Sequence, residues 1–166
     1  DVVLTGDCAY ACSGALASLI MENFPEKVTV KDVTRAEAMF KGSTLETINL
    51  DIPLKGASVI MANFCNNAAN LREFNGVISL SNGGNTFGSF GSIFDGCKSL
   101  EKLPTMLDMR PLDLNSTFRD CHRLRTIPDD FFSTWAFGCY DASWYTLANV
   151  FQRCYSLRKI PTSFSE

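Results

Sequence analysis

Three times this chain repeats the pattern that first appears as Phe94-Asp95-Gly96-Cys97-Lys98-Ser99-Leu100-Glu101-Lys102-Leu103-Pro104. The later copies run from Phe118 to Pro128 and from Phe151 to Pro161. They keep the Phe, the Cys, the first Leu and the closing Pro at the same offsets, and Ile replaces the last Leu. Such agreement indicates an internal repeat, and stacked repeats bury a core that neighbouring units share. The repeat therefore predicts a solenoid.

Weaker copies precede these three. Met39 to Ile48 is one residue shorter and lacks the cysteine, Phe64 to Phe74 is one residue longer with its cysteine displaced, and Tyr10 to Leu19 is the most degenerate. The anchor leucines are Leu16, Leu45, Leu71, Leu100, Leu124 and Leu157, which lie 29, 26, 29, 24 and 33 residues apart. A base period of about 24 residues falls in the leucine-rich-repeat range.

Each unit combines two local patterns. Ahead of the Phe, apolar residues lie three to four apart, as at Leu114 and Phe118, which predicts a short helix or turn. The Leu-x-x-Leu/Ile segment that follows predicts a short strand, usually closed by Pro. We therefore expect an α/β solenoid of about six units, each a short helix or turn plus a short strand. One repeat domain would span residues 1–166, with degenerate units at about 8–75 and regular units at 91–128 and 147–166.

Two insertions interrupt the period. Residues 76–90 are rich in Gly, Ser and Asn and predict a turn or hairpin around Asn82-Gly83-Gly84. Residues 129–146 are rich in aromatic residues. Trp and Tyr are common in binding hot spots and sugar-stacking platforms, so the candidate binding residues there are Trp135, Tyr140, Trp144 and Tyr145. Alternatively, these rings fold back and fill a gap between the fifth and sixth units, or they contact another subunit.

The unit from Phe94 to Pro104 resembles the BspA-type leucine-rich repeats and the related DUF285-like repeats of bacterial and phage surface proteins. The resemblance covers about residues 33–164. It implies a right-handed solenoid used as an extracellular recognition or adhesion module, sometimes in phage virion proteins. Repeats of this family lack catalytic residues, so the resemblance implies no active site. This chain departs from the family in its two insertions and in lacking cysteines at the Ser43 and Asn67 positions.

Composition and charge exclude several classes of protein. The sequence pI is about 5.2 and the net charge is −3, which argues against a nucleic-acid partner. No apolar run approaches the roughly 18–20 residues that cross a bilayer, so we expect no membrane insertion. The chain opens on Asp1, and the repeat is still running at Ile160 and Pro161. We therefore expect part of a longer chain or assembly.

The cysteines predict structure rather than chemistry. Cys97, Cys121 and Cys154 occupy one repeat position, so we expect an inward-facing ladder of reduced thiols. Cys8 and Cys12 suit half a zinc site or a local disulfide, although no second closely spaced ligand pair is present. The only histidine, His122, follows Cys121 and is expected in an exposed loop, away from the thiol. We predict no enzyme activity, no metal and no cofactor.

The strand positions predict a second candidate site. If Ile48, Phe74, Leu103, Ile127 and Ile160 point inward, the residue before each points outward, because strand side chains alternate. The outward positions are Thr47, Glu73, Lys102, Thr126 and Lys159, preceded by Glu46, Arg72, Glu101, Arg125 and Arg158. This mixed stripe is either a solvated face or a binding face whose Lys102, Arg125, Arg158 and Lys159 meet an acidic glycan or protein.

We therefore predict a non-catalytic recognition or adhesion module that binds a protein or glycan. Its expected place is extracellular, at a cell surface or on a virion. The alternative is a structural decoration or fibre module whose faces contact neighbouring subunits.

Overall fold

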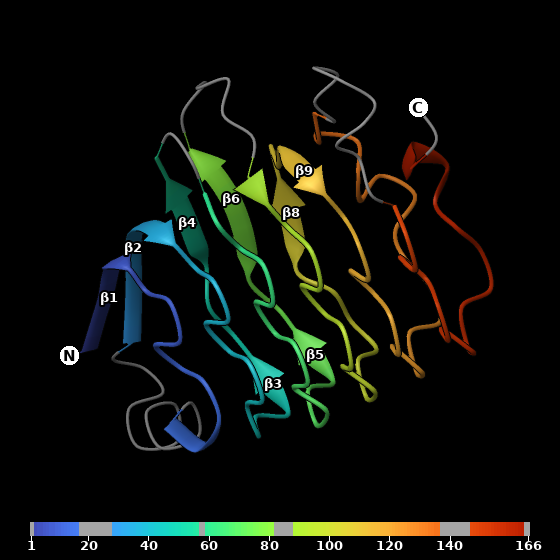
Figure 1. The fold of residues 1–166 in the computed structure, drawn as a ribbon, viewed down its shortest axis with the longest axis horizontal. Coiled ribbons are helices and arrows are strands. Elements are labelled where there is room, and N and C mark those ends of the chain that lie inside the picture. The colour runs from blue at the N-terminus through green and yellow to red at the C-terminus, as the bar shows by residue number, and fades with distance from the viewer. Residues whose placement is uncertain (1, 17–27, 57–58, 82–87, 137–146, 165–166) are drawn as a thin grey trace.

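The computed structural model describes residues 2–16, 28–56, 59–81, 88–136 and 147–164 (Figure 1). Its elements are the strands β1 (Val2–Asp7), β2 (Val28–Arg35), β3 (Thr47–Ile48), β4 (Ile52–Lys55), β5 (Glu73–Phe74), β6 (Val77–Ser81), β7 (Gly88–Ser89), β8 (Thr105–Leu107) and β9 (Pro111–Asp113), and the short 3-10 helix η1 (Thr162–Phe164). The main sheet has the order β1-β2-β4-β6-β8, while β3 pairs with β5 and β7 with β9.

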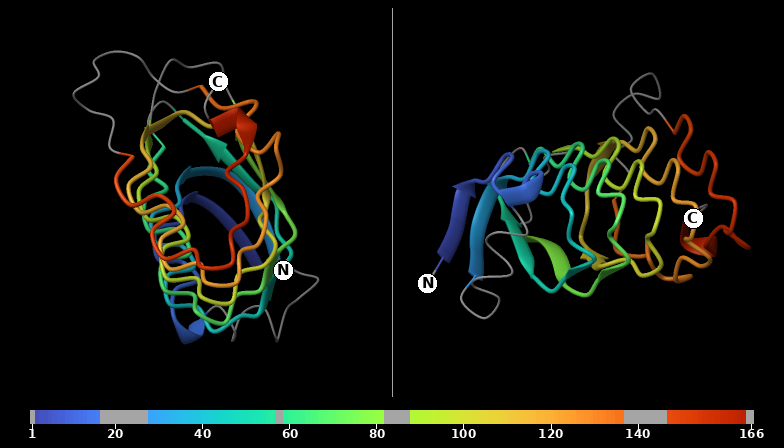
Figure 2. Two further views of the ribbon diagram at one scale, coloured as in Figure 1. Left: turned by 90° about the vertical axis from the view of Figure 1, so that its right-hand side faces the viewer. Right: turned by 90° about the horizontal axis from the view of Figure 1, so that it is seen from below.

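Every strand pair in these sheets is parallel. A chain that lays successive strands side by side in one direction must return between them, so it winds into coils. The result is a parallel β-solenoid with its coils stacked from the N-terminal to the C-terminal end (Figure 2). The prediction of a solenoid is confirmed.

Strand register places equivalent apolar residues in ladders. Ile52 of β4 lies opposite Ile78 of β6, and Leu54 lies opposite Leu80. All four side chains are buried, because alternate residues of a strand face the same side of the sheet. The core therefore runs along the solenoid axis, and no coil can bury its apolar face without its neighbours.

The expected α/β stack of six helix-plus-strand units is not supported. Among the described residues, η1 and the helical residues Ala15 and Leu16 are the only helical positions. The segments ahead of each Phe form consecutive turns instead. We call these segments the turn runs, and they comprise residues 9–12, 37–42, 62–67, 91–96, 115–120 and 148–153.

Backbone hydrogen bonding explains why turns replace helix. In the run 115–120, the Thr117 amide donates to the Leu114 carbonyl at 3.1 Å, closing a turn within the coil. The Ser116 amide instead donates to the Ala148 carbonyl of the next coil at 2.9 Å. Amides thus alternate between their own coil and the neighbouring one, which satisfies buried polar groups and ties the coils together. An α-helix would direct all its amides back into its own segment.

The turn runs also need left-handed backbone at two positions four residues apart. A type II turn requires a positive φ at its third residue, and Ser116 (φ 57°) is the third residue of the turn 114–117. The equivalent pairs are Tyr10 and Gly14, Ala38 and Gly42, Asn63 and Asn67, Ser92 and Gly96, Ser116 and Asp120, and Asn149 and Arg153. At Gly96 space is limiting too, since an added Cβ would lie 2.5 Å from the Asn67 Oδ1 atom.

Aromatic rings at the Phe position stack between coils. The ring centroids of Phe94 and Phe118 are 5.8 Å apart, and those of Phe118 and Phe151 are 5.7 Å apart, with interplanar angles of 12° and 3°. Parallel coils place identical side chains above one another, so each ring buries its faces against the same residue type. The Phe ladder is therefore the central packing element of the C-terminal half.

The structure corrects the alignment of the copy at Phe64. The Cys65 amide donates to the Ile93 carbonyl at 2.7 Å, which aligns Cys65 with Phe94. Ala68, rather than Asn67, then occupies the position of Cys97. A small side chain at this position still packs inside the coil, and Ala68 is fully buried.

Other expectations differ as well. Residues 77–81 form β6 of the main sheet instead of an excursion, while residues 82–87 lie outside the described residues. Ile160, expected inside, is 52% exposed, and the anchor Leu16 is 44% exposed. Both lie in terminal coils, so no further described coil covers them.

Candidate functional site

The exposed cations Lys102, Arg125, Arg158 and Lys159, which we call the basic row, lie on three successive coils. Two consecutive exposed residues, Arg125 and Thr126, lie between the buried Leu124 and Ile127, so this face does not have the strict alternation that was predicted. Thr47 of β3 pairs with Glu73 of β5, which bridges to Lys102, and all three side chains are exposed.

Arg125 and Arg158 occupy the same position in adjacent coils. The Arg158 amide donates to the Arg125 carbonyl at 3.2 Å, so the two side chains start from backbones in direct contact. Parallel chains in such a stack lie about 4.8 Å apart. Like charges on directly adjacent chains of such a stack repel each other and destabilise the pairing.

The positive and negative charges of this face are paired towards its N-terminal end, and positive charges remain unpaired towards its C-terminal end. Glu101 lies 3.7 Å from the Arg72 guanidinium and 3.6 Å from that of Arg123. Within the described part of the chain, Lys102, Arg125 and Arg158 have no ion-pair partner. The basic row therefore presents three uncompensated positive charges on neighbouring coils.

Lys159 differs from the rest of the row. Its ammonium donates to the Asp129 carboxylate at 2.8 Å, and this hydrogen bond holds the pKa of Asp129 below its usual value. The Thr162 amide lies 3.4 Å from the same carboxylate and acts in the same direction. Lys159 thus anchors the last coil to the one before it, and only partly serves as a free cation.

The aromatic candidates divide between core and residues that are not described. The Trp135 side chain is 7% exposed, and its indole nitrogen donates to the Met106 carbonyl at 3.2 Å. Its ring packs against Phe132 with centroids 4.8 Å apart. Trp135 therefore belongs to the core, where its side chain, instead of a further strand, hydrogen-bonds to β8. Tyr140, Trp144 and Tyr145 lie outside the described residues.

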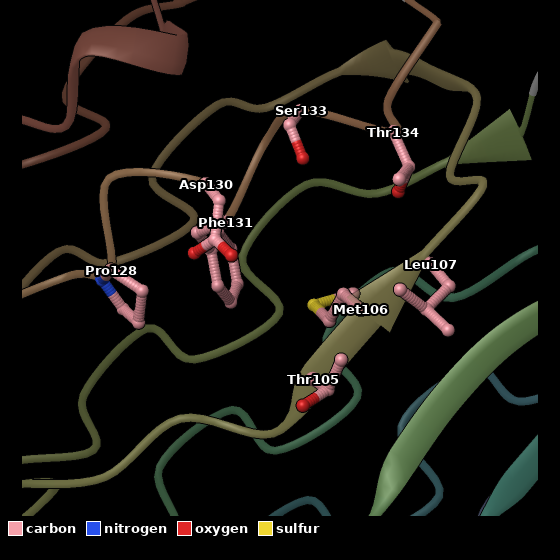
Figure 3. A pocket seen from close by; sticks show the side chains of 8 residues that line it. All are labelled: Thr105, Met106, Leu107, Pro128, Asp130, Phe131, Ser133 and Thr134. Atoms are coloured by element: carbon pink, nitrogen blue, oxygen red, sulfur yellow. The ribbon is translucent and has the colours of Figure 1, made fainter.

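Sequence reasoning missed a pocket of about 250 Å³ beside β8 (Figure 3). Thr105, Met106 and Leu107 of β8 form one wall, and the opposite wall comes from Pro128, Asp130, Phe131, Ser133 and Thr134. The pocket exists because β8 is a strand while the segment after Pro128 forms turns. The sequence signal that could have indicated the pocket is a difference between adjacent copies of the repeat. After the proline, one copy continues as Thr105-Met106-Leu107 and the next as Asp129-Asp130.

The cysteine ladder has the predicted arrangement. Cys97, Cys121 and Cys154 each donate their thiol proton to a backbone carbonyl of the preceding coil, at 3.0, 3.2 and 2.9 Å. Burial raises the pKa of Cys97 and Cys121 well above the ordinary value, and raises the pKa of Cys154 to about 11. These thiols stay protonated at neutral pH, and a protonated thiol is a poor nucleophile and a poor metal ligand.

Cys8 and Cys12 are both buried and free, so they form no disulfide with each other. Burial raises the pKa of Cys12 to about 11. Among the described residues, no cluster of three or more His, Cys, Asp or Glu side chains is arranged to hold a metal. The half zinc site that the spacing of these cysteines suggested therefore gains no further ligands there.

His122 points away from the thiol of its neighbour. Its Nε2 atom lies 3.3 Å from the Asp120 carboxylate, and its ring centroid lies 5.1 Å from that of Tyr155. The Cys121 thiol instead donates inward to Phe94. The imidazole is only partly exposed rather than free in a loop, and it serves as a packing surface for the last coil.

No helix in the described part of the chain is long and apolar enough to span a bilayer. Comparison with known proteins finds no matching family model, no matching curated protein and no matching solved structure.

Proposed function

We propose that this chain is a non-catalytic recognition module that binds an anionic partner at a cell surface or on a virion. The partner class is an acidic glycan or an acidic segment of a protein, and the contact is the basic row. A bacterial surface protein or a phage virion protein is the setting that fits the repeat. A relationship to the BspA-type leucine-rich repeats is part of the same proposal, supported by the stacking of the Phe and Cys positions.

One observation carries the proposal. Arg125 and Arg158 stand in adjacent coils without a carboxylate partner among the described residues, although their backbones are hydrogen-bonded. Their mutual repulsion works against the stability of the stack. A negatively charged ligand that bridges both guanidinium groups relieves this repulsion, and the relief adds to its affinity. Arg suits such a ligand because it pairs bidentately with carboxylate and sulfate-like oxygens.

The protonated thiols support a binding role rather than catalysis. Within the described residues, each cysteine of the ladder points into the core, and the imidazole of His122 contacts a carboxylate and a ring instead of a thiol. A nucleophile needs its base within hydrogen-bond distance. The exposed charges are therefore the better candidates for function than the buried nucleophiles.

The test is direct binding to immobilised polyanions. Heparin represents an acidic glycan, polyglutamate an acidic peptide and dextran a neutral glycan. We expect binding to at least one polyanion but not to dextran. Replacing Arg125 and Arg158 together by Gln should weaken binding about tenfold, the effect of two exposed contacts of roughly 0.7 kcal/mol each.

A matched control separates the row from net charge. Lys31 and Lys41 are exposed and lie towards the N-terminal end, so their joint replacement by Gln removes the same charge. We expect that variant to bind as the parent does. Equal losses in both double variants, or no polyanion binding at low salt, would contradict the proposal.

A structural role in an assembly is the second candidate. The exposed Leu112 on β9, which lies away from both ends of the solenoid, favours it, because a neighbouring subunit could cover this apolar side chain.

A further inference from the structure

The pocket beside β8 lies between two coils, each of which has a described neighbour on its far side. β8 pairs with β6 on the side away from the pocket. The opposite wall is backed by η1, since the Phe132 amide donates to the Ser163 hydroxyl at 3.2 Å and the Ser163 amide lies 3.4 Å from the Asp129 carbonyl. The pocket is therefore an internal feature of the stack, and both of its walls belong to the described chain (Figure 3).

The edge of β8 presents an unused amide to the pocket. The Thr105 amide donates to the Gly76 carbonyl of the preceding coil at 3.1 Å. Successive residues of a parallel strand direct their backbone groups to opposite sides, so those of Met106 face the pocket side. There the Met106 carbonyl accepts the indole N–H of Trp135, whereas the Met106 amide has no acceptor among the described residues. One backbone donor is therefore available to a ligand.

The opposite wall supplies acceptors and hydroxyl groups. Within the described part of the chain, the Asp130 carboxylate and the Ser133 hydroxyl have no hydrogen-bond or ion-pair partner. The Thr134 hydroxyl accepts the Asp108 amide at 3.0 Å and keeps its own proton free to donate. The side chains of Ser133 and Thr134 point from their wall towards β8 (Figure 3). Both walls therefore direct unused polar groups at the space between them.

The size and chemistry of the pocket define the class of ligand. Its floor is apolar, because Met106 and Phe131 are 2% and 7% exposed. Its volume of about 250 Å³ equals about eight water molecules at roughly 30 Å³ each, which is room for one sugar ring. A fitting ligand has a carbonyl for the Met106 amide, a small apolar group for the floor and hydroxyls for Asp130 and Ser133. An N-acetylated hexosamine carries all three, and a negatively charged sugar would be repelled by Asp130.

We propose that this pocket binds one uncharged N-acetylated hexosamine ring, with its acetamido carbonyl on the Met106 amide and its hydroxyls on Asp130 and Ser133. The acetyl methyl group then lies over the floor formed by Met106 and Phe131. A few polar groups that fix orientation over an apolar surface are typical of small-molecule sites. This second site does not depend on anion binding by the basic row. Dextran carries no acetamido group, so its expected failure to bind holds for both sites.

The test is an NMR titration of the 15N-labelled 1–166 chain with N-acetylglucosamine and with N-acetylgalactosamine. At least one of the two should bind with a Kd on the order of 1 mM, the affinity that about fifteen non-hydrogen atoms give. Its binding should shift the Met106 amide resonance, and saturation transfer from the protein should be strongest at the acetyl methyl group. Glucose, which lacks the acetamido group, should bind at least tenfold more weakly.

Two matched variants place the ligand in the pocket. Asp130→Ala should weaken binding about tenfold, because a carboxylate that accepts hydrogen bonds from sugar hydroxyls is lost. Glu46→Ala removes an exposed carboxylate outside the pocket and should bind as the parent does. Failure of both sugars to bind, equal binding of glucose, or equal losses in the two variants would overturn the proposal. N-acetylglycinamide binding as tightly as the sugars would replace the sugar by a peptide. Polyanion binding by Arg125 and Arg158 is measured separately and would be unaffected by any of these results.

Discussion

Arg153 holds Asp120 of the preceding coil through two hydrogen bonds, with its Nε and Nη2 atoms each 2.5 Å from a carboxylate oxygen. Arg119 grips Asp95 one coil earlier in the same manner, at 2.9 and 2.5 Å. These two ion pairs lie on the outside of successive turn runs and join them in addition to the backbone hydrogen bonds. They also make the last coils sensitive to acid.

Removing the Asp120 carboxylate should loosen the last coil. The hydrogen bonds from Arg153 lower the pKa of Asp120 in the folded chain, so its contribution to stability is complete above the unfolded value of about 3.9 and is lost as pH falls through the lower folded value. Asp120→Asn should therefore lower Tm at pH 7 by about 2 °C and flatten the acid limb of a Tm-against-pH curve. Asp108→Asn, at an exposed carboxylate without an ion pair in the described chain, is the control. An unchanged acid limb in Asp120→Asn would contradict the clamp.

Thiol reactivity should follow burial. With a pKa of about 11, Cys154 should react with iodoacetamide slowly at pH 8 and faster as pH approaches 11, because only the thiolate is nucleophilic. Cys97 and Cys121, fully buried, should remain unlabelled in the folded chain and react once it is unfolded in guanidinium. Peptide mapping after timed labelling measures each site. Rapid native labelling of Cys121 would be incompatible with the inward ladder.

Gly76 should tolerate no side chain. A Cβ there would lie 1.7 Å from the Leu50 carbonyl oxygen, and backbone cannot move aside as a flexible side chain can. Gly76→Ala should cost more than about 3 kcal/mol or prevent folding, measured by urea unfolding. Gly42→Ala is the comparison, since open space surrounds its Cβ and only its positive φ (64°) opposes the change, at about 1–2 kcal/mol. Equal costs at both positions would show that the close approach at Gly76 is unimportant.

Trp135 should contribute to stability and not to recognition. Trp135→Phe removes the hydrogen bond to the Met106 carbonyl and leaves that acceptor without its indole donor, which costs about 1–3 kcal/mol. Polyanion binding at a temperature where the variant is folded should be unchanged. The matched surface change is Arg125→Gln, for which we expect weaker binding and little loss of stability. The reverse outcome would return Trp135 to the binding surface.

The repeat, the solenoid, the cysteine ladder and the basic row could be predicted from the sequence, because each depends on spacing alone. Phe94, Cys97 and Leu100 recur at fixed offsets, and a fixed offset in a stacked chain means a fixed place in each coil. Buried residues three apart, such as Leu124 and Ile127, leave the two residues between them, Arg125 and Thr126, facing outward. These features needed no knowledge of which coil touches which.

The remaining features depended on contacts between coils, which only the tertiary structure determined. Apolar residues three to four apart suit a helix and a run of turns equally well, and the turns form at Ser116 because its amide finds a partner in the next coil. Cys65 aligns with Phe94 because of the same ladder of bonds. Trp135 became core, and the pocket beside β8 opened, because two adjacent coils differ in backbone after their prolines. Spacing along one chain specifies the place of a residue within its coil, but what covers that residue is decided by the neighbouring coil, and at the two ends no described coil supplies the cover.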